Sequence, residues 1–225
     1  MNQAPVSLVM FDLDGTLVDS VPDLAWSADR TLEHLGLPLV GEEKTRDYVG
    51  NGLYVLVKRI LTQQMDGEPD ATLYEQAVPI FWEYYRSNVS QFSQLYDGAL
   101  DALEGLKSRD YKVGCVTNKA EEFTRTLLSN LQIDHYFDQM VGGDTLAKKK
   151  PDPMQLLYLA NTQGIPIEQC MMVGDSRHDI AAAKAAGMRS VAVPYGYNHG
   201  EDIAISQPDY MLTSLRELPL LLDNL

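Results

Sequence analysis

The chain has 225 residues, a length typical of one large domain or of a core with a smaller insertion. Its composition is ordinary for a globular protein, with 45% hydrophobic and 22% charged residues. The net charge of −14 disfavours nucleic acid and anionic membranes as partners, although a local cluster of donors can still bind a small anion.

The first five residues lack the basic region and apolar segment of a secretory signal, and no apolar run approaches the roughly 20 residues of a membrane span. We therefore expect a cytoplasmic protein that contacts no membrane. The sequence leaves open whether it is a monomer or a homodimer. Cys115 and Cys170 lie in apolar runs and are expected to be reduced core residues.

The first predicted element is a strand over residues 6–11, whose sequence VSLVMF indicates burial on both faces. It leads directly into DLDGT at residues 12–16. Carboxylates are costly to bury without a partner, and ligands bind at the carboxyl ends of strands in open parallel sheets. The sequence therefore predicts a charged ligand beside Asp12 and Asp14, with a metal ion as the natural partner.

Helices are predicted over the segment that follows. Asp19 or Ser20 is expected to cap the first of them, with Pro22 in its first turn. Apolar faces predict further helices over residues 42–48, 53–65 and 71–88, and no convincing strand occurs between positions 20 and 95. We expect residues 19–95 to form a small four-helix cap domain inserted after the first strand.

From residue 96 onward the pattern alternates between helices and strands. Strands are predicted over residues 112–117, 136–141, 170–173, 190–193 and 210–212. Helices are predicted over residues 99–108, 121–130, 153–163 and 179–186, and from 214 onward. This alternation is typical of α/β proteins and predicts a Rossmann-like, doubly wound parallel sheet. The core domain would then comprise residues 1–18 and 96–225.

Residues that follow successive parallel strands meet at one edge of the sheet. The candidates at this edge are Asp12, Asp14, Thr117, Asn118, Lys150 and Asp175. Their carboxylates offer the oxygen ligands that suit Mg²⁺, and a lysine beside a hydroxyl suits a phosphoryl group. Taken singly, Thr117 is equally explained as a β-prone residue or helix cap, and Asp175 is plausible as a helix N-cap without a metal. Lys150 taken singly is better explained as one more solvated charge in the run of lysines at 148–150. Their joint placement at strand ends favours a site.

Four segments resemble, in order, the motifs of the haloacid dehalogenase-like phosphatases. They are DLDGT at 12–16, VTN at 116–118, KP at 150–151 and GDSRHD at 174–179. The resemblance implies an aspartyl-phosphate mechanism in which Asp12 is the nucleophile and Asp14 is the general acid and base.

The same resemblance implies a role for the other strand-end residues. Mg²⁺ would be held by Asp12, by the backbone carbonyl of Asp14 and by Asp175. Thr117 and Lys150 would contact the phosphoryl group, with Asn118 beside them. Asp179 would support the site without a direct bond to the metal.

Further segments resemble bacterial phosphoglycolate phosphatases, and the likeness covers nearly the whole chain. They are YVGNGL at 48–53, LYDG at 95–98, VGGD at 141–144 and YGYNHGED at 195–202. This implies a small phosphate ester as substrate, 2-phosphoglycolate, which is hydrolysed to glycolate and phosphate. Gly50 and Asn51 are candidates for binding its carboxylate, although physical grounds alone favour a turn between helices that needs positive φ as the reason for the glycines.

Other functions remain open at this stage. A phosphatase for sugar phosphates or a β-phosphoglucomutase-like phosphotransferase would share the core. A signalling receiver domain also gathers acids, threonine and lysine around Mg²⁺, but it accepts phosphate on a later strand and has no helical insertion. His34, His135, His178 and His199 show no metal-ligand spacing and are expected on the surface or on helices.

Overall fold

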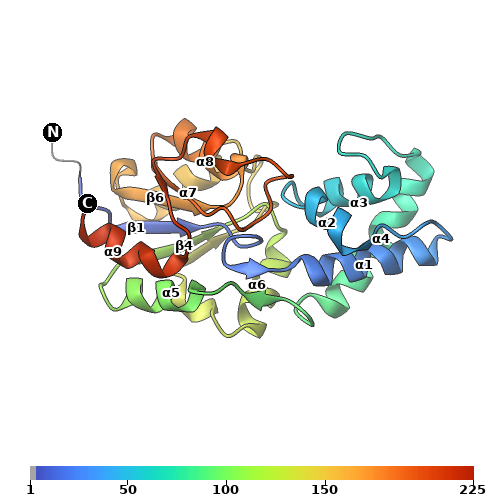
Figure 1. Cartoon of the computed structure of the whole chain (residues 1–225), viewed down its shortest axis with the longest axis horizontal. Helices are drawn as coiled ribbons and strands as arrows, with labels where there is room; N and C mark the ends of the chain where they lie inside the picture. Colours follow the sequence, from blue (N-terminus) through green and yellow to red (C-terminus); the bar gives the residue numbers. More distant parts are fainter. Residues whose placement is uncertain (1–3) are drawn as a thin grey trace.

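A computed structural model describes residues 4–225 of the chain (Figure 1). Residues 1–3, which belong to the predicted core segment and to the N-terminal stretch assessed for a signal, lie outside the described residues. Within residues 4–225, six strands form one sheet in the order β5-β4-β1-β6-β7-β8, and every pair in it is parallel. The strands are β1 (Leu8–Phe11), β4 (Lys112–Val116), β5 (Gln139–Val141), β6 (Cys170–Gly174), β7 (Arg189–Ala192) and β8 (Tyr210–Met211). The predicted doubly wound parallel α/β core is confirmed.

The central position of β1 explains where a site can form. The chain passes from β1 outward to β4 and β5 on one side, and then returns to place β6, β7 and β8 on the other. Such a reversal of winding leaves a crevice at the carboxyl ends of the strands beside it. The ends of β1, β4 and β6 therefore converge, and these strands carry the predicted site residues.

Helices cover both faces of the sheet, with α7 and α8 on one face and α5 and α6 on the other (Figure 1). Leu8 and Met10 pack into the cluster that includes residues of α7 and α8, whereas Val9 and Phe11 pack into the larger cluster on the opposite face. Successive side chains of a strand point to opposite faces, so burial on both sides requires the continuous apolar run. The core helices are α5 (Ala99–Lys107), α6 (Glu121–Asn130), α7 (Met154–Gln163), α8 (Arg177–Ala186) and α9 (Leu218–Asp223).

The helical segment between β1 and the rest of the core lies at the carboxyl end of the sheet (Figure 1). Its helices are α1 (Val21–His34), α2 (Gly41–Tyr48), α3 (Leu53–Thr62) and α4 (Ala71–Asn88). The expected extension of α3 to residue 65 is wrong, because Gln63 adopts a left-handed φ of 52° and ends the helix. The other predicted helices that the structure contains differ from these bounds by a few residues at most.

The two connections between the helical segment and the core run side by side. The two-residue strands β2 (Val18–Asp19) and β3 (Gln94–Leu95) pair in antiparallel fashion. The expectation of no strand between positions 20 and 95 therefore misses β3. Two residues are too few to show the alternation that marks a strand in sequence.

A buried carboxylate ties the first of these helices to the second connection. Asp23 on α1 accepts hydrogen bonds from the side chain of Asn88, from the backbone of Phe92 and from the backbone and hydroxyl of Ser93. These donors satisfy a charge that would otherwise be costly to bury. They hold the entry and exit of the helical segment together.

Two further expectations concern single residues and membrane contact. Cys115 and Cys170 are both buried and free of disulfide bonds, as predicted. Within residues 4–225, no helix combines the length and the apolar character that crossing a membrane requires.

Asp138 strengthens the pairing of β5 with β4 just before β5 begins. Its N–H donates to the carbonyl of Val113 at 2.8 Å, and its carboxylate accepts from the Val113 N–H at 2.9 Å. Lys107 and Lys112 also donate to the carboxylate, at 3.0 and 2.8 Å. Partial burial raises the pKa of Asp138, but the hydrogen bonds from Lys112, Val113 and Lys107 outweigh it and lower the pKa to about 2.

We predict that Asp138→Asn lowers the free energy of unfolding by about 1–2 kcal/mol at pH 7, because the charge-assisted hydrogen bonds are lost. An unfolded aspartate titrates near pH 4, so the advantage of the wild type is complete above about pH 5. It should fade as the pH falls through 4 toward 2, where the folded carboxylate becomes protonated. Urea unfolding of both proteins across this range measures the difference, and a pH-independent difference would contradict the assignment.

Candidate active site

Asp12 follows the last residue of β1 and is held in place by the strands on either side. Its N–H donates to the carbonyl of Val173 on β6 at 2.9 Å, which continues the pairing of the two strands. Its Oδ1 accepts from the Leu13 N–H at 2.7 Å and lies 2.9 Å from Nζ of Lys150. The turn needs glycine at position 15, where φ is +92° and a Cβ atom would collide with the carboxylate of Asp175.

Three carboxylates meet beyond the ends of β1 and β6. Single oxygens of Asp12, Asp175 and Asp179 all lie within 4.8 Å of one another. Asp175 accepts from the Thr16 hydroxyl at 2.7 Å and from the Tyr197 N–H at 2.5 Å. Asp179 lies one turn into α8, where its carboxylate accepts from the backbone and hydroxyl of the N-cap residue Ser176.

Lys150 is buried between these acids, with 2% of its surface exposed. Its ammonium group lies 2.9 Å from Asp12 Oδ1 and donates to Asp179 Oδ1 at 2.6 Å and to the Val116 carbonyl at 2.7 Å. These contacts use all three of its donors. Burial lowers the pKa of Lys150, but Asp12 and Asp179 raise it above its ordinary value, so the side chain stays charged.

The acids of this cluster hold more negative charge than the neighbouring lysine neutralises. Burial above all, with smaller contributions from Asp179 and Asp14, raises the pKa of Asp12 to about 7 against the opposing effect of Lys150. Burial also raises the pKa of Asp175 well above its ordinary value, with contributions from Asp12 and Asp179. Closely spaced carboxylate oxygens with excess negative charge are the kind of site that a hard divalent cation requires.

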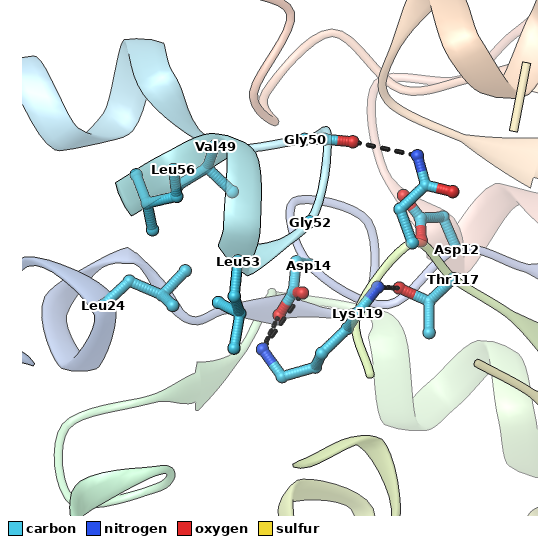
Figure 2. Close-up of a pocket in the computed structure, with 11 residues that line it drawn as sticks. Asp12, Asp14, Leu24, Val49, Gly50, Gly52, Leu53, Leu56, Thr117 and Lys119 are labelled. Atoms are coloured by element: carbon cyan, nitrogen blue, oxygen red, sulfur yellow. Dashed lines mark hydrogen bonds and ion pairs between the residues drawn. The ribbon is translucent and has the colours of Figure 1, made fainter. Parts of the chain in front are cut away.

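Asp14 points into a pocket on the other side of the loop (Figure 2). Its carboxylate accepts from the Ser20 hydroxyl at 2.6 Å and from Nζ of Lys119 at 2.9 and 3.1 Å. Ser20 occupies the N-cap position of α1, as expected, but its hydroxyl makes no capping hydrogen bond and donates to Asp14 instead. The start of α1 therefore positions an acid of the core.

Thr117 and Asn118 line the same pocket at the end of β4. The Thr117 hydroxyl accepts from the Lys119 N–H at 3.2 Å, so its own hydrogen can donate to a bound oxyanion. The Asn118 amide group donates to the carbonyls of Gly50 and Lys150, at 3.1 and 3.0 Å. Asn118 therefore joins the core to the helical segment.

The helical segment closes the pocket with an apolar wall (Figure 2). Backbone at Gly50 and Gly52 completes this side of the pocket. The apolar side chains that line it are Leu24, Val49, Leu53 and Leu56. A small polar group bound here would be screened from water on the side of the helices.

Asn51 lies between the two glycines but directs its side chain away from this lining. Its Oδ1 accepts from Arg59 at 2.9 Å, and its Nδ2 lies 3.0 Å from Nε2 of His178 on α8. Lys149 donates to its backbone carbonyl at 2.7 Å. Asn51 thus anchors the loop between the core and the helical segment, and its predicted contact with substrate stays a prediction.

Two of the four histidines lie at this same contact. Besides His178, His199 has Nδ1 2.7 Å from the carbonyl of Asp47, and its ring lies 5.9 Å from that of His178. Both are partly buried. The sequence pattern could not show that residues more than 120 positions apart would dock a loop together.

The structure brings Asp12, Lys150, Asp175 and Asp179 together, with Asp14, Thr117 and Asn118 beside them. Sequence analysis missed Lys119, the partner of Asp14, and the supporting contacts of Ser20 and Thr16. Lys119 follows Thr117 and Asn118 at the end of a predicted strand, and that position was the available signal. Thr16 lies within the DLDGT segment itself.

Known proteins with similar sequences include hydrolases and phosphatases. Residues 9–193 match the family model of the haloacid dehalogenase-like hydrolases. A phosphoglycolate phosphatase of Nitrosococcus oceani is 51% identical over 217 residues, which cover 96% of each chain. One of Vibrio parahaemolyticus is 43% identical over 97% of this chain and 96% of its own.

Solved structures show the same fold. The crystal structure of a predicted phosphoglycolate phosphatase from Haemophilus somnus superposes with a TM-score of 0.91 at 36% sequence identity, over 96% of this chain and 97% of that one. CbbY from Rhodobacter sphaeroides, solved in complex with phosphate, has a TM-score of 0.79 at 24% identity over 95% and 96% of the two chains, and at that identity it supports the fold alone.

We predict that Lys150→Met destabilises the fold by about 3–5 kcal/mol at pH 7, because Asp12 and Asp179 would remain buried without their ammonium partner. Lys148→Met is the matched control, since Lys148 is exposed and pairs with Asp152 at the surface, and it should cost less than about 1 kcal/mol. Urea unfolding measures both. Equal stabilities of the two variants would show that Lys150 does not hold these carboxylates.

Proposed function

Because this chain belongs to the haloacid dehalogenase-like hydrolases, we propose that it is a phosphatase whose substrate is 2-phosphoglycolate. The proposal rests on one arrangement above all: Asp12 and Asp14 line a pocket at the end of the central strand, and the helical segment covers one side of it. The named function of relatives that are 41–51% identical over almost the entire chain supports this choice of substrate.

The pocket suits a small and strongly anionic ester. Its polar side chains come from the core, and four apolar side chains form the wall opposite them. A sugar phosphate would have to bury several hydroxyl groups against this wall without hydrogen-bond partners, which is costly. The geometry therefore favours the phosphate ester of a short acid over a sugar phosphate. This argument counts against a sugar-phosphate phosphatase and equally against a β-phosphoglucomutase-like phosphotransferase. Because the chain belongs to the hydrolase family, we set aside the alternative of a signalling receiver domain.

In the first step, we assign the attack on phosphorus to the Asp12 carboxylate. A bond forms between a carboxylate oxygen and phosphorus, and the bond from phosphorus to the glycolate oxygen breaks. Asp14 gives its proton to that leaving oxygen. Thr117 donates a hydrogen bond to a phosphoryl oxygen, and Lys150 fixes the orientation of Asp12 through Oδ1.

In the second step, water attacks the phosphorus of the aspartyl-phosphate and Asp14 takes its proton. The bond between phosphorus and Asp12 breaks, inorganic phosphate leaves, and the Asp12 carboxylate is restored. The Ser20 and Lys119 hydrogen bonds hold the Asp14 carboxylate beside the reacting atoms for this role. Closure by the helical segment, which we propose acts as a cap over residues 19–95, limits the water that reaches the site.

Mg²⁺ is the cation we infer for the acidic cluster. Asp12, Asp175 and the backbone carbonyl of Asp14 would hold it, and Asp179 would support them through Lys150 and Ser176. When bound, a divalent cation supplies positive charge that keeps Asp12 ionised and offsets the charge of the phosphate. The expected cytoplasmic location and the choice between monomer and homodimer stay predictions.

The substrate is tested by comparing kcat/KM for 2-phosphoglycolate, hexose phosphates and pyrophosphate in the presence of Mg²⁺. We expect 2-phosphoglycolate to exceed the others by at least about tenfold, since each 1.4 kcal/mol of selective binding to the transition state gives a factor of ten. Asp12→Asn should lower turnover of every substrate at least about a thousandfold while the fold is kept. A preference for a hexose phosphate would refute the proposed substrate, and substantial turnover by Asp12→Asn would refute the nucleophile.

Removal of divalent cations should abolish turnover, and Mg²⁺ should restore it. We further expect Asp175→Asn to raise the Mg²⁺ concentration needed for half activation by about tenfold or more, because a carboxylate is lost from the cluster. Asp152→Asn is the control, as Asp152 forms an exposed pair with Lys148 outside the cluster. Full activity in excess chelator would count against the metal site.

A further inference from the structure

We propose that Lys119 binds the carboxylate group of the substrate and thereby selects a phosphorylated hydroxy acid over neutral phosphate esters. The inference rests on the proposed function and adds to it the residue that recognises the part of the substrate distant from phosphorus. Neither the strand-end pattern nor the acidic cluster requires a second lysine at this point.

Lys119 lies at the start of the loop that follows β4, one residue beyond Asn118. Only 3% of its surface is exposed, and it lines the pocket between the core acids and the apolar wall (Figure 2). Among the described residues that line this pocket, it is the one with a cationic side chain. In a chain of net charge −14, binding an anion at this wall requires such a local cation.

The other cationic side chains near the pocket already donate to protein groups. The three donors of Lys150 go to Asp12, Asp179 and a backbone carbonyl. Arg59 donates to the carbonyls of Tyr48 and Met65 and to the side chain of Asn51, and so supports the loop from behind. Lys149 donates to the Asn51 carbonyl. None of these three side chains is among the described residues that line the pocket.

The short distance between Lys119 and Asp14 places the Lys119 ammonium group close to the expected position of the substrate carboxylate. Asp14 has to come within hydrogen-bond reach of the oxygen that leaves phosphorus, and Nζ of Lys119 lies 2.9 Å from the Asp14 carboxylate. In 2-phosphoglycolate, a single CH₂ group separates that leaving oxygen from the carboxylate carbon. A donor in contact with Asp14 is therefore within reach of a carboxylate oxygen when Asp14 contacts the leaving oxygen.

The surroundings of Lys119 strengthen this contact. Its Nζ lies 4.9 Å from the centre of the buried Tyr85 ring, whose face favours a cation. Leu24 and Leu53 complete the dry side of the pocket. An ion pair that is shielded from water is stronger than one at the surface, and the ammonium group has three donors to share between Asp14 and the substrate.

The test separates this role from a role in positioning Asp14. The probes are two competitive inhibitors, 3-phosphonopropionate and propylphosphonate, of which only the first carries a carboxylate. Neither is hydrolysed, so their inhibition constants do not depend on proton transfer by Asp14. The proteins are the wild type, Lys119→Met, Lys119→Gln and the surface control Lys148→Met, each checked for folding by thermal unfolding.

We expect the wild type and Lys148→Met to bind 3-phosphonopropionate more tightly than propylphosphonate by the same ratio. Lys119→Met should lower that ratio by about 10- to 100-fold, as loss of a charged hydrogen bond predicts. Lys119→Gln can still donate to Asp14 but carries no charge, and should lose the preference as well. A ratio unchanged in either folded Lys119 variant would overturn the proposal.

Turnover distinguishes failure of this inference from failure of the proposed function. If the wild type hydrolyses 2-phosphoglycolate no better than ethyl phosphate, the proposed substrate is wrong. If the wild type keeps its preference and the Lys119 variants lose activity equally toward both esters, Lys119 only positions Asp14 and the present inference is wrong.

Discussion

The structure depends on the convergence of four carboxylates at the ends of β1 and β6. Asp12, Asp14, Asp175 and Asp179 lie there with two buried ammonium groups, so the cluster retains negative charge when all six are ionised. Burial and mutual repulsion raise the pKa of Asp12 and Asp175. A cluster of this kind suits the divalent cation that we propose for it, and shielding from bulk water would strengthen the effect of that cation on a phosphate.

The two lysines divide the acids into two groups with different surroundings. Lys150 pairs with Asp12 and Asp179 on the side of the carboxylate cluster, whereas Lys119 pairs with Asp14 on the side of the pocket. The two acids of one loop, to which we assign the roles of nucleophile and proton carrier, therefore have separate cationic partners. The short loop after β1 supplies both acids, and the side chains around it distinguish them.

The helical segment contributes to the site through contacts as well as through coverage. Ser20 at the start of α1 donates to Asp14, and the loop around Asn51 is held by Asn118, Lys149 and His178 of the core. The helical segment therefore both lines the pocket and helps to position Asp14. The apolar side chains of Leu24, Val49, Leu53 and Leu56 offer no hydrogen-bonding partners to a sugar, which supports the small acidic substrate that we propose.

Much of this could be predicted from the sequence because it depends on local patterns. The apolar run of β1, the alternation of strands and helices after residue 96 and the DLDGT segment determine the fold class and the edge at which ligands bind. The proximity of Asp12, Asp14, Thr117, Lys150 and Asp175 could be predicted because the residues that follow parallel strands meet at one edge of the sheet. Only the tertiary structure decided that Lys119 pairs with Asp14 and that the Ser20 hydroxyl donates to Asp14. It also decided that the Asn51 side chain contacts Arg59 and His178 and does not line the pocket. Each depends on how different elements of the chain pack against one another, and no periodicity within a single element encodes such a contact.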